Sequence, residues 1–107
     1  MNYGIKYKEF MSIDGMKNAA GNVYQVDQSG FYTTVVANEV IRTPGAWISF
    51  RAWAGAAELQ LKLNNSAGVF RVPNDSQAHG VDGLEINRIT VLGDAGQTIR
   101  LEGLSAY

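Results

Sequence analysis

The strongest candidate for chemistry in this sequence is a polar loop, residues 74–83, that contains its single histidine, His79. Ser76, Asp75 and Asp82 lie in the same loop. These are the residue types of a Ser-His-Asp triad, in which an imidazole takes a proton from the hydroxyl while a carboxylate orients the ring. A working triad needs its members on separate rigid elements, whereas these residues share one loop. We therefore expect a solvated histidine and no enzymatic activity.

Carboxylates in this part of the chain also suggest a calcium site. Asp75, Asp82 and Glu85 supply the hard oxygen ligands that calcium prefers, but the ion needs roughly six to eight of them. The EF-hand spacing and the glycine patterns of nucleotide sites are both missing. Acidic residues and glycines in a loop are also common turn formers. We expect no bound metal and no cofactor, and calcium binding by residues 74–85 stays an open alternative.

A second distinctive group lies on an expected strand, residues 47–54. Strict alternation places Trp47, Arg51 and Trp53 on the face opposite Phe50. Tryptophan and arginine concentrate binding energy at protein interfaces, exposed indoles are suited to contacts with sugars, and large aromatic side chains are often simply buried. These residues are therefore candidates for a partner-binding face, a sugar platform or part of the core.

The elements that must position these residues follow from the alternation of apolar and polar side chains. A period of two, interrupted by clusters of Gly, Asn, Asp or Pro, is typical of antiparallel strands. Leu59, Leu61 and Leu63 give the clearest example, since they alternate with polar residues. The expected strands cover residues 3–7, 23–27, 31–37, 39–42, 47–54, 59–63, 69–72, 84–92 and 97–104.

Short connections with turn-forming residues join these strands. Gln28-Ser29-Gly30 suits a hairpin with the glycine in the left-handed conformation. Thr43-Pro44-Gly45-Ala46 suits a type II turn that reverses the chain. Gly93-Asp94-Ala95-Gly96 suits a hairpin between the last two strands. The isoleucines within residues 86–89 break strict alternation, which predicts a β-bulge near Asn87-Arg88.

Length and composition bound the architecture. The chain has 107 residues, 46% of them hydrophobic, and no cysteine, which predicts one soluble domain over residues 1–107. About eight short strands cannot bury their apolar faces in one flat sheet, so we expect an antiparallel β-sandwich of jelly-roll type. A net charge of −1 argues against nucleic acid and acidic membranes as partners. We also expect no export signal and no membrane-spanning helix.

Residues 1–11 are expected to form an N-terminal arm or an edge strand. Tyr3, Ile5 and Tyr7 alternate with glycine and lysines, as in a strand. Such a segment can add to the sheet of a neighbouring chain by main-chain pairing. Tyr3 and Tyr7 are therefore further candidates for partner binding.

The segment 83–101, GLEINRITVLGDAGQTIRL, resembles a hairpin of the pattern I-x-x-I-x-V-x-G-x-A-G in small virion proteins of tailed bacteriophages. The resemblance implies a small β-sandwich on the capsid exterior, the neck or a tail appendage. It further implies a virion location after assembly in the bacterial cytoplasm, with the major capsid or tail proteins as partners and a homo-oligomeric state.

Two classes of function remain from the sequence. The first is a non-enzymatic virion structural protein that decorates or bridges the capsid or tail through protein contacts. The alternative is a lectin-like carbohydrate-binding module that uses exposed tryptophans, with a subunit of a pilus or a toxin complex as a third hypothesis. The accessibility of the two tryptophans separates these classes, because a sugar site needs exposed indoles in the monomer.

Overall fold

The computed structural model describes residues 10–17, 21 and 23–105, so the expected strand over residues 3–7 lies outside the described residues. The described part of the chain forms strands and no helix. The strands are β1 (Met11–Ser12), β2 (Tyr32–Thr33), β3 (Glu39–Ala54), β4 (Leu59–Leu63), β5 (Phe70–Val72), β6 (Asp82–Val91) and β7 (Thr98–Ser105). All pairings between them are antiparallel, which confirms the all-β class.

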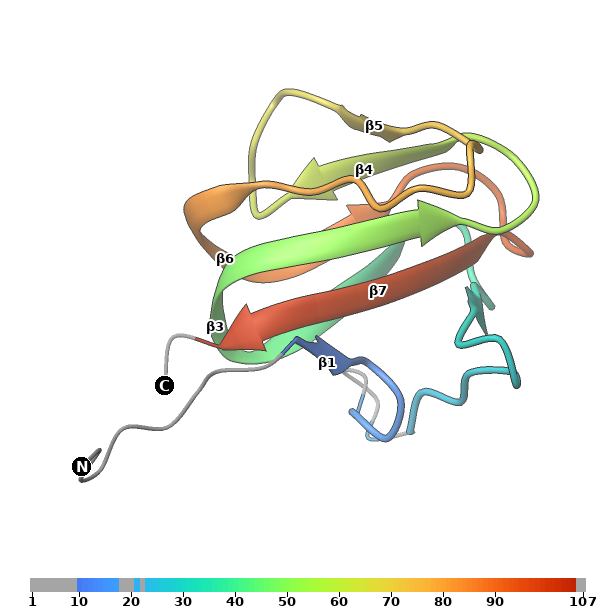
Figure 1. The fold of residues 1–107 in the computed structure, drawn as a ribbon, viewed down its shortest axis with the longest axis horizontal. Coiled ribbons are helices and arrows are strands. Elements are labelled where there is room, and N and C mark those ends of the chain that lie inside the picture. Colours follow the sequence, from blue (N-terminus) through green and yellow to red (C-terminus); the bar gives the residue numbers. More distant parts are fainter. Residues whose placement is uncertain (1–9, 18–20, 22, 106–107) are drawn as a thin grey trace.

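The strands form one curled sheet (Figure 1). Its hydrogen-bonded order is β1-β7-β3-β6-β4-β5, and β2 also pairs with β7. Although β6 and β4 separate β3 from β5 in this order, Phe50 of β3 packs edge-on against Phe70 of β5, with ring centroids 5.4 Å apart. The sheet must curl for this contact to form, so the described residues make a half-barrel around one interior.

β3 makes the curl because it changes its main partner along its length. Glu39–Arg42 pair with β6 alone, Trp47 and Ser49 pair with both β6 and β7, and Phe50–Ala54 pair with β7. The register against β6 shifts between Arg42 and Trp47. The expected chain reversal at Thr43–Ala46 is therefore wrong: this segment lies inside one continuous strand, at the shift in register. Proline is tolerated at such bulges.

The bulge expected near Asn87-Arg88 coincides with this register shift, but the extra residues belong to β3. Asn64 directly follows β4, and its side chain forms hydrogen bonds with backbone groups of β6 at the irregular pairing. Its Oδ1 accepts hydrogen bonds from the backbone N–H groups of Asn87, at 2.7 Å, and Arg88, at 3.3 Å. Its Nδ2 donates to the carbonyl of Glu85 at 2.8 Å. The bulge is thus a stabilised part of the fold.

The connection between β6 and β7 is an arch, so the expected hairpin over residues 83–101 is wrong. β3 lies between β6 and β7 in the sheet, and Gly93–Gly96 pass across the start of β3. The backbone N–H of Asn38 donates to the Gly93 carbonyl at 2.8 Å, and the Asn38 Oδ1 accepts from the Gly93 N–H at 2.8 Å. A short glycine-rich connection can form either a hairpin between paired strands or an arch over a third strand. The local sequence does not determine which strands pair.

The interior of the half-barrel is apolar. Among the described residues, its fully buried side chains come from the loop before β2 and from strands β3 to β7: Ile13, Tyr24, Ile41, Trp47, Phe50, Leu59, Leu61, Val72, Ile86, Ile89, Ile99 and Leu101. The sequence predicted the leucines of β4 on one buried face, and Leu59 and Leu61 confirm it with 2% and 0% exposure.

One buried polar network lies among these apolar side chains. Glu39 is 7% exposed, and its carboxylate accepts hydrogen bonds from the Tyr32 hydroxyl at 2.5 Å and the Val35 N–H at 2.8 Å. The ring of Tyr24 meets that of Tyr32 edge-on at 4.9 Å, and its hydroxyl donates to the Val40 carbonyl at 3.3 Å. Burial raises the pKa of Tyr24 to about 12. Burial and the bond to Glu39 also raise the pKa of Tyr32.

This network holds a region with less regular strand than the sequence predicts. The expected strand over residues 31–37 is reduced to β2, and within 23–27 only an isolated bridge between Lys17 and Val23 remains. The turn between them is as expected, with Gly30 left-handed at φ 85°. In this region the side chains of Tyr24 and Tyr32 make contacts with each other, with Val40 and with Glu39.

Candidate functional site on the outer face of β3 and β7

The register between β3 and β7 defines the outer face of the sheet. Trp53 lies opposite Arg100, and Arg51 lies opposite Glu102. Directly opposed residues project from the same face of a sheet. Their neighbours along β7, including Leu101, are buried, so these four residues share the outer face.

Trp47 does not belong to this face, which corrects the grouping expected from the sequence. Trp47 pairs with Ser105, while Ser49 pairs with Leu104, so two steps along β3 match one along β7. Such an extra residue is a β-bulge. It moves every side chain before it to the opposite face of the sheet. Trp47 is accordingly turned to the interior and is 2% exposed, whereas Arg51 and Trp53 keep the outer face.

Two arginines stack on aromatic rings across this face. The guanidinium carbon of Arg100 lies 4.6 Å from the ring centroid of Trp53, and that of Arg51 lies 4.1 Å from the ring centroid of Phe10. Arg100 also donates two hydrogen bonds to the carboxylate of Glu102, at 3.1 and 2.9 Å. Exposed pairs of these kinds are each worth only about 1 kcal/mol or less. Their main effect here is to fix the orientation of the side chains.

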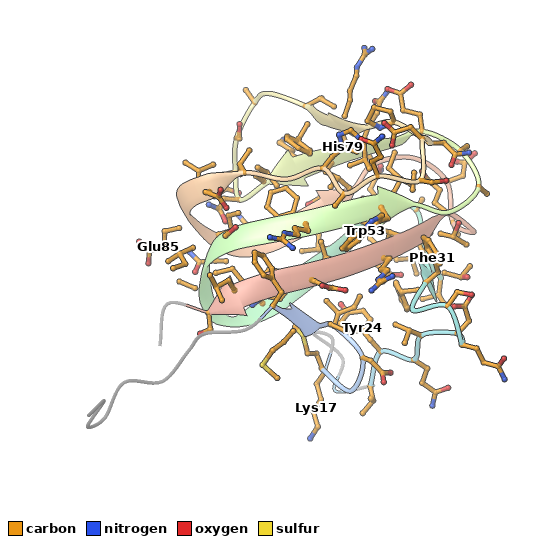
Figure 2. All side chains as sticks on the ribbon, viewed as in Figure 1. Lys17, Tyr24, Phe31, Trp53, His79 and Glu85 are labelled. Atoms are coloured by element: carbon orange, nitrogen blue, oxygen red, sulfur yellow. The ribbon has the colours of Figure 1, made fainter. Side chains whose placement is uncertain are left out.

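The outer-face cluster, defined as Phe10, Arg51, Trp53, Arg100 and Glu102, carries a positive charge. The carboxylate of Glu102 forms an ion pair with Arg100. Arg51 is exposed, and no carboxylate of the described residues lies within ion-pair distance of it. Figure 2 shows Trp53 over the β3 and β7 part of the sheet. The cluster therefore offers an exposed cation, a half-buried indole and a fixed Arg-Glu pair for contact with another molecule.

The sequence did not predict that Phe10, Arg100 and Glu102 lie on this face. Arg100 and Glu102 alternate with Ile99 and Leu101, so the pattern of β7 already marks them as outward. The missing information was that β7 pairs with β3, because only that register brings Arg100 to Trp53. Phe10 belongs to the expected N-terminal arm, residues 1–11, but no pattern in the sequence placed it against Arg51.

The two N-terminal candidates, Tyr3 and Tyr7, lie outside the described residues.

The polar loop forms an acid-imidazole pair and no triad. His79 Nε2 lies 2.9 and 3.0 Å from the two carboxylate oxygens of Asp75, and this bond lowers the pKa of the carboxyl group. The backbone of His79 exchanges hydrogen bonds with Ala52 of β3, which fixes the loop to the sheet. Asp82 instead accepts a bond from Ser49, and no hydrogen bond between the described residues joins Ser76 to the imidazole.

The calcium alternative finds no support in the geometry of the loop. Within the described part of the chain, no three acidic, histidine or cysteine side chains form a group that could hold a metal ion. Asp75 binds His79 and Asp82 binds Ser49, so the carboxylates are directed to different partners.

Comparisons with known proteins add no family assignment. No family model, no curated protein and no solved structure matches the chain. In the described residues, no helix has the length and apolar character needed to cross a membrane. The function must therefore be inferred from the surface itself.

Proposed function

We propose that this chain is a non-enzymatic structural protein that works by binding other proteins through the outer-face cluster. Trp53 and Arg51 belong to the residue types that dominate interface energies. Both lie on a strand at the centre of the sheet, where pairing on β7 holds Trp53 and Arg100 in register. This preorganised pair of residues is the observation that carries the proposal, since fixed side chains lose less conformational entropy on binding.

The same geometry favours a protein partner over a sugar. Stacking of a sugar ring needs a free aromatic face, but Arg100 already covers one face of Trp53. Trp47, the other member of the expected sugar platform, is 2% exposed. A positive, partly apolar surface suits an acidic and apolar patch on a partner protein.

We propose further that the partner is a virion component, in line with the resemblance to small proteins of tailed phages. In this role the chain decorates or bridges the capsid or tail, as a homo-oligomer on major capsid or tail proteins. A symmetric lattice turns a weak single contact into strong avidity, so one small surface suffices. The jelly-roll arrangement belongs to the same proposal, in which β3 passes between two layers at its shift in register.

Substitutions on the outer face test the binding surface. Purified particles of the phage whose genome carries this chain are incubated with the full chain, and bound protein is quantified after sedimentation. We expect Arg51→Ala and Trp53→Ala each to weaken binding at least tenfold. The matched control is Arg71→Ala, which removes an exposed arginine from β5. Unchanged binding of both outer-face variants would reject the surface.

Mass spectrometry of the same purified particles tests the virion role. We expect the chain at a copy number that is a multiple of the particle symmetry. If the chain is missing from washed particles and instead shows dose-dependent binding on a glycan array, the lectin alternative replaces this proposal.

A further inference from the structure

A pocket opens on the inner side of the sheet, at the end where β1 meets β7. Its volume is about 430 Å³, within the range of roughly 300–1,000 Å³ typical of binding pockets. The lining residues come from β1, the turn that follows it and the inner face of β3 and β7: Met11, Ser12, Asp14, Gly15, Met16, Trp47, Gly103 and Ser105. The pocket lies on the opposite side of the sheet from the outer-face cluster.

The walls of this pocket are suited to apolar side chains. Trp47 and Gly103 both line it, and the indole of Trp47 packs directly on the backbone of Gly103. Met11 and Met16 also line it, and methionine side chains adapt readily to the shape of a ligand. Met11 is 68% exposed, so a large apolar group is left in water unless something covers it.

One carboxylate gives the pocket a charge preference. Asp14 is the single charged residue among the described residues that line it. Its Oδ1 is held by the backbone N–H of Val26 at 3.4 Å, and Asp14 itself is exposed. The occupant should therefore combine apolar groups with a positive charge.

The N-terminal segment of the chain itself has this chemistry. Tyr3, Ile5 and Tyr7 stand at alternate positions, with Lys6 and Lys8 between and beside them. In an extended segment these three apolar side chains lie on one side, about 6.5–7 Å apart, and the lysines lie on the other. The apolar side chains of one face can enter the pocket, and the long, flexible side chain of a lysine on the other face can fold back to the exposed carboxylate of Asp14.

The direction of β1 favours the segment of a second copy over the chain's own. Met11 pairs with Gly103 and Ser12 with Glu102, so β1 runs antiparallel to β7 and begins on the side of Ser105, the last residue of β7. A segment that continues in this direction leaves the sheet and must reverse to return to its own pocket. The segment of a neighbouring chain has no such constraint.

We propose that the segment Tyr3–Lys8 of a second copy of this chain occupies the pocket, with its apolar side chains against Trp47 and a lysine beside Asp14. This inference rests on the proposed function, in which copies of this chain assemble with one another. It concerns a different surface, so the two can fail separately.

Self-association of the full chain gives the first test, measured by sedimentation velocity over a range of concentrations. We expect Met11→Glu and Ile5→Asp each to weaken association at least tenfold, because each puts a charge into the apolar contact. The matched control is Leu84→Glu, at a residue 48% exposed outside the pocket. Circular dichroism confirms that each variant folds. Association unchanged by Met11→Glu would overturn the proposal.

A peptide with the sequence of residues 1–10, MNYGIKYKEF, gives the second test, since it contains no tryptophan. It is titrated into the full chain carrying Ile5→Asp and Trp53→Phe, whose fluorescence reports Trp47 alone. We expect a saturable change in the emission intensity of Trp47 with the native peptide, loss of that change with added Met11→Glu, and at least threefold weaker binding with Asp14→Asn. A scrambled peptide with equal effect would overturn the proposal.

The outcomes also separate this inference from the outer-face proposal. If the native chain is monomeric at all concentrations and Ile5→Asp alone makes Trp47 accessible to quencher, the chain's own segment fills the pocket and the second-copy inference is wrong. Loss of particle binding in Arg51→Ala, with self-association unchanged, would support the outer-face cluster as the particle-binding surface and the pocket as a separate surface for self-association.

Discussion

The indole of Trp47 lies against the backbone of Gly103 so closely that a Cβ on that glycine would overlap the ring carbons Cδ2, Cε2 and Cε3. The contact depends on the bulge between Trp47 and Ser49, which turns the indole inward. It joins β3 to the end of β7, and both residues line the pocket. A glycine in a strand interior commonly marks such a close approach.

Gly103→Ala should therefore destabilise the fold by about 1–3 kcal/mol, the usual cost of overpacking a core. The matched control is Gly68→Ala, because a Cβ at Gly68 would meet its nearest neighbour, Ser66 Oγ, at 3.6 Å. That substitution should change stability by about 0.5 kcal/mol or less. Urea unfolding followed by circular dichroism measures both. Equal stability of the two variants would contradict the close contact.

The buried bond between Tyr32 and Glu39 makes a second prediction. Tyr32→Phe removes the hydroxyl that donates to a carboxylate only 7% exposed, and a buried charged acceptor that loses a donor costs about 1–3 kcal/mol. Tyr24→Phe removes a neutral bond of 3.3 Å to a carbonyl and should cost less, about 0.5–1.5 kcal/mol. Urea unfolding of the two variants gives the order, and a larger loss in Tyr24→Phe would refute it.

The tyrosines also make stability sensitive to alkaline pH. Burial raises the pKa of Tyr24 from 10.0 to about 12, and the pKa of Tyr32 is raised as well. Above pH 10 the unfolded chain loses these protons first, so the stability present at lower pH decreases as the pH rises towards 12. Urea midpoints measured from pH 9 to 12 should show this decrease, and Tyr24→Phe should make it shallower. A flat profile in the native chain would exclude the effect.

Acrylamide quenching should distinguish the two tryptophans. Trp53 is half-buried beneath Arg100, whereas Trp47 is 2% exposed. We expect Trp53→Phe to remove the quenchable part of the emission, and Arg100→Ala to increase quenching of the native chain by uncovering an indole face. If emission in Trp53→Phe is quenched as strongly as in free tryptophan, Trp47 is not in the interior.

Several elements could be predicted from local pattern alone. The alternating leucines fixed β4 as Leu59–Leu63, and the left-handed Gly30 followed from its place at the end of a turn. The candidate site was found only in part, through Arg51 and Trp53. Its remaining members could not be predicted, because their position depends on a pairing between β3 and β7 that local pattern does not encode.

The amino-acid sequence by itself determined an all-β, antiparallel chain, since a period of two is a local property of an extended backbone. Only the tertiary structure decided the partners of each strand, the continuity of β3 through its shift in register, the arch from β6 to β7 and the inward turn of Trp47. The physical reason is that one extra residue in a strand reverses the face of every side chain beyond it. Whether the strand accommodates that residue depends on hydrogen bonds and packing with distant parts of the chain. One example is the packing of the Trp47 indole on the backbone of Gly103.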